Sequence, residues 1–426
     1  MIFANGKLLP DTQRQAVLDG LEERLNAVRA GPPLEAETVI AAVDALGKRL
    51  ESGEFDPLLA RFLPAGMSLD QLIPLLRRES LQAKLDAELG AGAFRPRALP
   101  ESTAYTLPLG VLFHIAPGNM PGLPVYTALE GLLTGNINLV KLPHGDKGLS
   151  LAAFQLLVEQ EPGLAPYLYA FDLPSGQRDG IKSLADLADG LVVWGGDGAI
   201  GAARGLAGPG CKLIEWGHRL SFAYVSGYED KEAELSALAG HIVETGQRLC
   251  SSCQVIFLDG TDWEAGADFC QEFLPYLERA AEKRPGVGAG AAASLSGHAA
   301  LLERIVEGRA EGEALFRGKG CSVVLRPDRD LELSPMEGNV LVKLLPQGEL
   351  LAVLRRQKGR LQTAGLICEP RRREELASLL ARAGLTRVTR AGGMSASFPG
   401  EAHDGEYPLR RYLRVVDVET GPVSHS

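Results

Sequence analysis

A cysteine and a glutamate near the middle of the chain have side chains suited to covalent acyl chemistry. Cys250 closes the run 244–250, ahead of the strand-forming residues 255–257, and Glu215 lies upstream of it. A thiolate can attack a carbonyl carbon, and a carboxylate can move a proton or activate a water. Each residue alone has an ordinary alternative, because most cysteines are small buried hydrophobic residues and most glutamates are solvated. The pair indicates a nucleophile only together with further motifs.

A glycine-rich turn upstream is typical of phosphate binding. Residues 191–194 form an apolar run, and the following Gly196, Gly198 and Gly201 match the pattern G-x-G-x-x-G at the start of a helix. Backbone amides at such a helix start attract an anion, although the same turn also occurs without a ligand. Glu215 lies where an ordinary Rossmann dehydrogenase keeps its ribose-binding acid. This glutamate therefore has two candidate roles, and they imply different enzymes.

The spacing of apolar side chains predicts the elements that position these residues. Helical spacing covers 12–30, 35–53 and 68–90, the last with a capping box from Ser68 to Gln71. After residue 105 short apolar runs alternate with helices, which predicts βαβ units and a parallel sheet. The predicted strands are 109–115, 137–142, 167–172, 190–194, 221–225 and 254–258, and the predicted helices are 122–134, 147–160, 180–187, 199–207 and 230–248.

The last third of the chain is expected to continue the mixed pattern. Residues 262–318 are expected to be helical, residues 320–345 and 362–368 to contain strands, and residues 372–384 to form a helix. The tail 410–419 alternates like an edge or exchanged strand.

Composition excludes several classes of function. Of the 426 residues, 45% are hydrophobic and 23% charged, which is typical of a soluble globular protein. The net charge of −10 argues against a nucleic-acid surface. The six cysteines lack the spacing of a disulfide scaffold, and the first residues lack a secretion signal, so we expect a cytoplasmic protein with free thiols. The longest uncharged run, 102–129, is interrupted by four prolines, so we expect no membrane span.

Five motifs in order over residues 108–257 resemble the aldehyde dehydrogenase superfamily. They are the turn 117–121 (PGNMP), the segment 134–136 (TGN) before the strand ending at Lys141, the glycine turn, 215–217 (EWG), and 246–250 (GQRLC). Within the superfamily, the phrases 250–255, 216–222 and 403–409 are similar to the acyl-CoA reductases of the LuxC family. This resemblance extends from about residue 100 to the end. It implies an aldehyde dehydrogenase-like α/β fold, with a Rossmann-type nucleotide-binding domain and an α/β catalytic domain.

The resemblance also implies a catalytic group. Cys250 would attack an acyl thioester, expected to be a fatty acyl-CoA, and hold the acyl group until hydride from NADPH releases an aldehyde. Asn119 and the backbone N–H of Cys250 would stabilise the oxyanion. Glu215 would be a proton-transfer group near Cys250.

The cofactor residues follow from the same resemblance. Lys141 would reach the adenosine ribose or its phosphate, and His144 favours NADPH because it tolerates a 2′-phosphate that a glutamate would repel. Gly196, Asp197, Gly201 and the helix after them would face the pyrophosphate, unless Asp197 instead caps that helix. The sequence motif that binds the nicotinamide ribose in relatives has only weak matches here, at Glu332 and Glu337. No metal is expected.

The expected organisation is a nucleotide-binding domain over 1–216 with a helical N-terminal region, a catalytic domain over 217–395, and a C-terminal strand segment over 396–426. This last segment is expected either to rejoin the sheet or to join a partner subunit in an oligomer. By analogy with the superfamily we expect a homo-oligomer. An acyl-carrier protein or an acyl-activating subunit is a candidate partner.

Other readings remain open. The chain could be an NAD(P)-dependent aldehyde dehydrogenase that oxidises an aldehyde to the acid, a dinucleotide sensor with an inert Cys250, or an ordinary Rossmann dehydrogenase. His114 is expected to be a core histidine, Cys253 a core residue or a resolving thiol, and His403 a turn or active-site residue.

Overall fold

The computed structural model describes residues 1–63, 69, 72–116, 121–283, 289–308 and 311–419, with the backbone alone for 289–294. The chain forms two compact units. The first contains Met1–Gly217 and Phe398–Ser426, and the second contains His218–Ser397.

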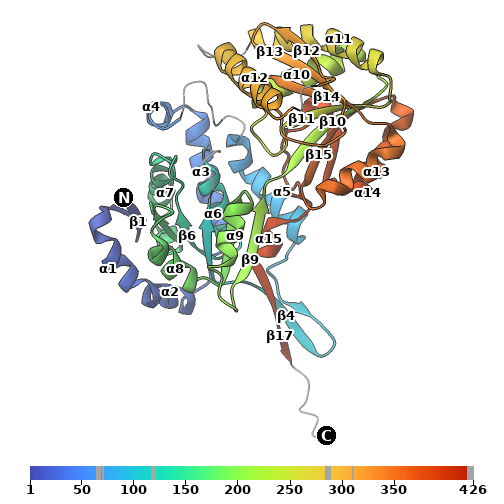
Figure 1. The fold of residues 1–426 in the computed structure, drawn as a ribbon. Helices are drawn as coiled ribbons and strands as arrows, with labels where there is room; N and C mark the ends of the chain where they lie inside the picture. Colours follow the sequence, from blue (N-terminus) through green and yellow to red (C-terminus); the bar gives the residue numbers. More distant parts are fainter. Residues whose placement is uncertain (64–68, 70–71, 117–120, 284–288, 309–310, 420–426) are drawn as a thin grey trace. The chain divides into compact units, whose positions relative to one another are not determined.

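A seven-stranded sheet forms the centre of the first unit, in the order β2-β1-β7-β6-β5-β8-β9 (Figure 1). Strands β5 to β9 are parallel, and β1 pairs antiparallel with β7 and with β2. The order reverses between β5 and β8, which is where doubly wound sheets bind ligands at the carboxyl ends of their strands. The strands are β1 (Ile2–Ala4), β2 (Lys7–Leu9), β5 (Val111–Ile115), β6 (Ile137–Lys141), β7 (Leu168–Phe171), β8 (Gly190–Gly195) and β9 (Lys212–Gly217).

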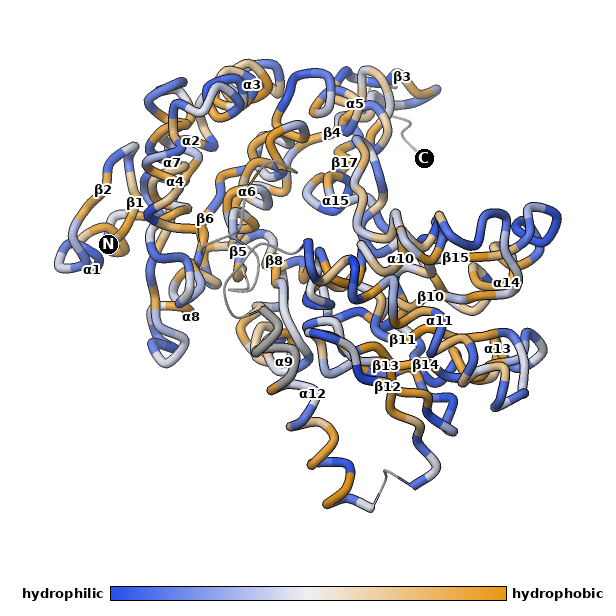
Figure 2. Tube along the Cα trace, turned by 90° about the horizontal axis from the view of Figure 1, so that it is seen from above, coloured by the Kyte–Doolittle hydropathy of each residue, from blue (hydrophilic) through white to orange (hydrophobic). Residues whose placement is uncertain are grey.

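Helices cover both faces of this sheet, so its inner strands are apolar along their whole length. Helices α3, α5, α6 and α7 pack on one face, and α1, α2, α8 and α9 on the other. Apolar and polar stretches alternate along α3 in Figure 2, as expected for a helix with one buried side. The helices are α1 (Arg14–Asp19), α2 (Leu21–Ala30), α3 (Ala36–Glu51), α4 (Asp56–Leu59), η2 (Ile73–Leu76), α5 (Arg78–Leu89), α6 (Leu123–Leu133), α7 (Leu149–Gln160), α8 (Arg178–Asp186), α9 (Asp197–Arg204) and α15 (Pro408–Arg411).

The second unit contains another seven-stranded sheet, in the order β12-β13-β14-β11-β10-β15-β16. Only β12 runs antiparallel to its neighbour among these strands. Helices α10 and α11 cover one face, and α13 and α14 the other. The elements are β10 (Leu220–Ser226), α10 (Lys231–Thr245), β11 (Cys253–Leu258), α11 (Trp263–Glu282), α12 (Ala289–Val306), β12 (Ala314–Gly318), β13 (Cys321–Arg326), β14 (Asn339–Leu344), α13 (Leu350–Leu354), β15 (Leu361–Cys368), α14 (Arg373–Ala383) and β16 (Arg387–Arg390).

A small sheet in the first unit contains the end of the chain. Strand β17 (Leu413–Glu419) pairs antiparallel with β4 (Ser102–Pro108), which also pairs with β3 (Arg97–Ala98) (Figure 1). The tail is therefore an edge strand, and its partner is β4 rather than a strand of the seven-stranded sheet. Its outer residues include Val415, which is 64% exposed.

The predicted α/β fold is confirmed, and most predicted elements are present. The expected helix 12–30 is broken at Gly20, a poor helix former. The segment 314–318 is strand β12 instead of helix, because the positive φ of Gly320 allows a tight turn into β13. The hairpin of β1 and β2 and the strand β9 were not predicted. Only Ile214 and Trp216 of β9 are buried, so its sequence lacks an apolar run. The capping box at 68–71 lies outside the described residues, apart from Leu69.

Candidate active site

Cys250 lies in the loop 246–252, which connects α10 to β11 in the second unit. The loop begins with two residues at positive φ, Gly246 at 55° and Gln247 at 62°. It then closes a tight turn, because the Ser252 N–H donates to the carbonyl oxygen of Leu249 at 2.9 Å and the Leu249 N–H donates to Ser252 Oγ at 3.0 Å. Cys250 is inside this turn and is exposed.

Two buried glutamines fix the backbone of this loop. Gln247 donates from Nε2 to the carbonyl oxygen of Cys253 at 3.1 Å, and its Oε1 accepts from the Gly338 N–H at 3.1 Å. Gln254 donates to the carbonyl oxygen of Gln247 at 2.8 Å and accepts from the Ser334 N–H at 3.1 Å. A buried amide is costly when it lacks hydrogen bonds, so these bonds hold the loop in one conformation.

Further bonds tie the backbone on each side of the thiol. Ser221 Oγ donates to the carbonyl oxygen of Cys250 at 2.7 Å and accepts from the Thr363 N–H at 3.0 Å. His241 Nε2 accepts from the Cys253 N–H at 3.3 Å, which requires the neutral ring. Burial lowers the pKa of His241 to about 4, in agreement with that role. Sequence patterns gave no role to Ser221, His241 or the two glutamines, although Ser221, Gln247 and Gln254 lie within the segments that resemble the family.

The second cysteine of the loop region differs from Cys250. Cys253 is buried at the start of β11, and burial raises its pKa to about 12. It is therefore a core residue, which decides between its two expected roles. No group of three or more His, Cys, Asp or Glu side chains in the described part of the chain is arranged to hold a metal.

Glu332 and Glu337, the two candidates for contact with the nicotinamide ribose, lie in different surroundings. Glu332 pairs with Arg326 at 2.9 Å and with the fully buried Lys343 at 2.5 Å. Glu337 has a positive φ of 56°, and its backbone N–H donates to the carbonyl oxygen of Gly246 at 3.1 Å. Its carboxylate accepts from Arg248 Nε at 2.6 Å. Glu337, not Glu332, is thus the one bonded to the nucleophile loop.

In the first unit, Lys141 and Glu215 share one row across the carboxyl ends of the parallel strands. Register pairs Lys141 with Ile115, Ile115 with Val193, and Val193 with Glu215. Paired residues of neighbouring strands project to the same face, so both charged side chains lie on the face covered by α9. Three strand spacings separate them, or about 14 Å.

Glu215 is held by an arginine of α9. Arg204 donates from Nε to Oε1 at 2.6 Å and from Nη2 to Oε2 at 2.8 Å, a bidentate arrangement. These hydrogen bonds lower the pKa of Glu215, against the opposing effect of its partial burial. The carboxylate is therefore ionised at neutral pH. Sequence patterns gave no indication of Arg204.

Lys141 is buried rather than on the surface, with 7% of its area exposed. Burial lowers its pKa, and the carboxylate of Asp172 acts in the opposite direction. The Lys141 ammonium group is 3.4 Å from the carbonyl oxygen of Leu142, which is a weak contact. His144 follows β6 and is exposed. Lys141 is thus a buried cation at the sheet edge where a nucleotide phosphate is expected.

The glycine turn connects β8 to α9 as predicted. Gly195 has a φ of 154°, and a Cβ there would lie 2.9 Å from Ala199 Cβ. Gly196, Gly198 and Gly201 are exposed, and a Cβ at any of them would meet nothing within 4 Å, so the surface above them is open. Helix α9 begins at Asp197 with Gly196 as its N-cap, and no side chain caps it. The alternative in which Asp197 is the N-cap is therefore wrong, because Gly196 occupies that position and Asp197 is the first residue of the helix.

These features fit the pyrophosphate of a dinucleotide. The open glycine turn lies at the start of α9, beside the strand-order reversal, and the buried Lys141 cation lies on the same face. Helix N-termini and cations both stabilise phosphate.

The predictions for His114, His403 and Asn119 have different outcomes. His114 is a fully buried core residue, as expected, bonded to Thr127 Oγ1 at 3.0 Å and Asn138 Oδ1 at 2.9 Å. His403 is in a tight turn, and its ring lies 4.9 Å from that of Trp194 and 5.0 Å from that of Trp216. Asn119 lies outside the described residues.

Comparisons with known proteins indicate the family of the chain. The family model described as "Acyl-CoA reductase (LuxC)" matches residues 33–415, so the match begins well before the expected residue 100. A long-chain acyl-protein thioester reductase of Aliivibrio fischeri is 24% identical over 367 residues, which cover 81% of this chain and 72% of the relative.

Solved structures share the fold. A methylmalonate-semialdehyde dehydrogenase from Oceanimonas doudoroffii superposes with a TM-score of 0.73 at 14% identity, over 99% of this chain and 98% of the other. A glyceraldehyde-3-phosphate dehydrogenase from Methanocaldococcus jannaschii, complexed with NADP, gives 0.65 at 14% identity over 97% and 95%. The chain therefore has the aldehyde dehydrogenase fold. None of the described helices is long and apolar enough to cross a membrane.

Proposed function

This chain belongs to the acyl-CoA reductase (LuxC) family, and from that membership we propose that it reduces a fatty acyl thioester to an aldehyde, with NADPH as reductant and Cys250 as nucleophile. One observation carries the proposal. The exposed Cys250 lies in a tight turn whose backbone is fixed by the buried Gln247 and Gln254. A nucleophile held in this way loses little entropy when it meets its substrate.

The first half of the reaction forms an acyl-enzyme. The Cys250 thiolate attacks the carbonyl carbon of the substrate, a new C–S bond forms, and the thioester bond to the carrier breaks. The carrier leaves as a thiolate and is protonated. Negative charge collects on the carbonyl oxygen in the tetrahedral intermediate. The Cys250 N–H and the Asn119 amide are the proposed donors to this oxygen.

The second half releases the aldehyde. The reduced nicotinamide, when bound, supplies the hydride that converts the acyl group to an aldehyde. Cys250 leaves as a thiolate, ready for another substrate. We propose that Glu215 serves as the proton-transfer group, and that Arg204 keeps its carboxylate ionised and oriented.

The cofactor contacts are proposed from the sheet edge of the first unit. Lys141 would contact the adenosine ribose or its 2′-phosphate, with His144 beside it. Gly196, Asp197 and Gly201 would lie along the pyrophosphate. We propose Glu332 as a ligand of the nicotinamide ribose. Glu337 is the alternative, and it is supported by the hydrogen bond from its backbone N–H to the nucleophile loop.

The comparisons suggest two different carriers for the acyl group. The family description names acyl-CoA, whereas the relative's name specifies a protein thioester. We propose CoA as a substrate carrier, with an acyl-carrier protein or acyl-activating subunit as a candidate partner. A homo-oligomer in the cytoplasm is proposed by analogy.

The proposal is tested by supplying dodecanoyl-CoA and NADPH and measuring aldehyde and free CoA. We expect the two products in equal amounts. The competing function is oxidation of an aldehyde to the acid with NAD(P)+ and water. Dodecanal oxidised without CoA, together with no reduction of the thioester, would favour that function.

A further inference from the structure

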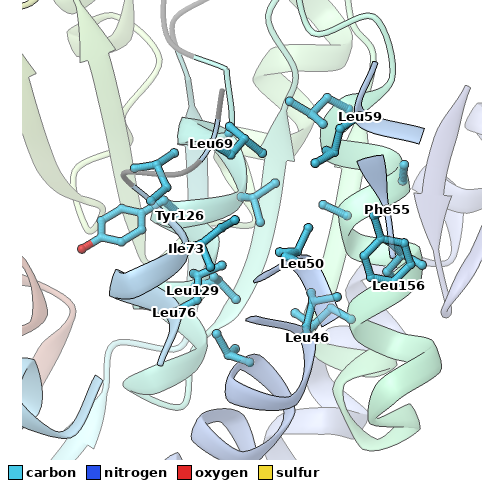
Figure 3. A pocket seen from close by; sticks show the side chains of 18 of the residues that line it. Leu46, Leu50, Phe55, Leu59, Leu69, Ile73, Leu76, Tyr126, Leu129 and Leu156 are labelled. Atoms are coloured by element: carbon cyan, nitrogen blue, oxygen red, sulfur yellow. The ribbon is translucent and has the colours of Figure 1, made fainter. Parts of the chain in front are cut away.

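The first unit contains an apolar pocket on the side of its sheet that is covered by α3, α5, α6 and α7. Helices α3, α4, η2, α6 and α7 surround a cavity of about 100 Å³ that opens to solvent. Figure 3 shows leucine, isoleucine and aromatic side chains converging on it from these helices. None of the described residues that line it is charged.

The pocket is lined by regular stripes of three helices. Val43, Leu46 and Leu50 contribute from α3, and Val125 and Leu129 from α6. These positions are three, four or seven residues apart, so each stripe is one face of its helix. Protein interiors rarely contain voids larger than a water molecule, because unfilled apolar space loses dispersion contacts. Helical faces arranged around an unfilled space are therefore typical of a ligand site.

Tyr126 contributes only its ring to this wall. Figure 3 shows its hydroxyl directed away from the other labelled side chains. The ammonium group of the buried Lys84 lies 5.9 Å from the ring centre, and it pairs with Glu130 at 2.9 Å. Lys84 also pairs with the buried Glu88 at 2.5 Å, so the nearest buried charged groups are paired with one another behind the ring. An uncharged, flexible apolar chain fits the pocket, whereas a phosphate or a sugar would find no partner.

We propose that this pocket binds the hydrocarbon chain of the acyl thioester, and that Ala152 and Ala153 of α7 set the chain length it accepts. The proposal rests on the proposed function for the identity of the ligand. Gly122, which lines the pocket, follows the expected oxyanion residue Asn119 by three residues in the chain. The pocket lining and the proposed oxyanion residue are thus close together in the sequence.

The two alanines are the specificity positions because they leave the space unfilled. Both line the pocket, one turn before Leu156 on the same helix. A larger side chain at either position would occupy volume that the end of a long acyl chain needs. Short chains would not reach that volume and would be unaffected.

The test compares Ala152→Phe with wild type and with Ala27→Phe, a matched change on the exposed side of α2. We measure kcat/KM for butanoyl- and tetradecanoyl-CoA, and calorimetric binding of tetradecanoate, which needs no catalysis. In wild type, kcat/KM should rise about fourfold per methylene until the pocket is full. Ala152→Phe should keep the butanoyl value, lose at least about tenfold with tetradecanoyl-CoA, and lose tetradecanoate binding. Ala27→Phe should match wild type.

A second variant guards against misfolding. Leu156→Ala enlarges the pocket, so its preference should move toward longer chains. Equal losses on both substrates, or an unchanged preference and unchanged tetradecanoate binding in both pocket variants, would overturn the pocket assignment. If wild type forms no thioester on Cys250 but Ala152→Phe still abolishes tetradecanoate binding, the proposed function fails and the pocket assignment stands.

Discussion

Arg204 donates two hydrogen bonds to Glu215, from Nε to Oε1 at 2.6 Å and from Nη2 to Oε2 at 2.8 Å. The arginine belongs to the helix after the glycine turn, and the glutamate to the neighbouring strand β9. The contact joins the expected phosphate-binding helix to the expected proton-transfer residue. It also makes the role of Glu215 testable, because the arginine can be changed without touching the carboxylate.

Glu215→Gln separates the two roles of the glutamate. If Glu215 transfers a proton, kcat should fall by about 100-fold to 10,000-fold while the KM for NADPH changes little. Steady-state kinetics with varied NADPH measure both constants. A raised KM with an unchanged kcat would instead show that Glu215 binds the ribose, as in an ordinary Rossmann dehydrogenase.

Arg204→Leu should move the pH profile of kcat/KM. The arginine lowers the pKa of Glu215, so its removal raises that pKa. A base is active when ionised, and its activity falls as pH drops through its pKa. The acid limb should therefore shift to higher pH. The Glu215→Gln protein is the control, because adding Arg204→Leu to it should not shift the pH profile of kcat/KM. An unshifted limb in the single variant would contradict the role of this pair.

Thiol reagents should modify Cys250 first. Cys250 is exposed, whereas burial raises the pKa of Cys253, Cys270 and Cys321 to about 12. Thiolates, not thiols, react with iodoacetamide, so these buried cysteines should resist at neutral pH. Mass spectrometry of tryptic peptides measures the order of labelling. An unreactive Cys250 in folded protein would support the sensor hypothesis.

Lys141→Met should weaken cofactor binding. Loss of a hydrogen bond to a charged group costs about 1.5–3 kcal/mol, so the KM for NADPH should rise by about tenfold to 100-fold. Lys182→Met, on the exposed side of α8, is the matched control. His144→Glu should lower the preference for NADPH over NADH, because a carboxylate repels the 2′-phosphate. Equal KM values for NADPH in wild type and Lys141→Met would refute the assignment of Lys141.

The pH dependence of stability should include a contribution from His114. Burial lowers its folded pKa to about 4, from 6.5 when exposed. Between these values the unfolded chain binds a proton that the folded chain does not, so stability is lost as pH falls from about 6.5 toward 4. The full loss is about 3 kcal/mol. Thermal unfolding at pH 5 and 7 should show a smaller difference for His114→Gln than for wild type. The exposed His218→Gln is the control; an unchanged difference in His114→Gln would contradict the prediction.

Sequence spacing predicted the parallel strands well, because each is buried on both faces and reads as an apolar run, as β5 and β6 do. It missed β9, in which only Ile214 and Trp216 are buried, and the hairpin β12–β13, which depends on Gly320. Short or half-buried strands are held by pairing with distant partners, and local spacing does not encode those partners.

The candidate site was predictable where a motif is continuous in sequence. Cys250 and the glycine turn could be found in this way, and both occupy suitable positions in their own units. Arg204 and His241 could not, since their roles arise from hydrogen bonds to residues of other elements. The resemblance was expected to begin only near residue 100, yet helices before that residue, with the segments that join them, line more than half of the apolar pocket. Their apolar faces look the same in sequence whether they line a core or a cavity.

The most direct test of the account mixes dodecanoyl-CoA with wild-type protein and with Cys250→Ala in the absence of NADPH. Intact-mass spectrometry should show one dodecanoyl group on the wild type, at the peptide containing Cys250, with one equivalent of CoA released. The Cys250→Ala protein should show neither, and it should make no aldehyde when NADPH is added. Aldehyde formation by Cys250→Ala at the wild-type rate would contradict the account.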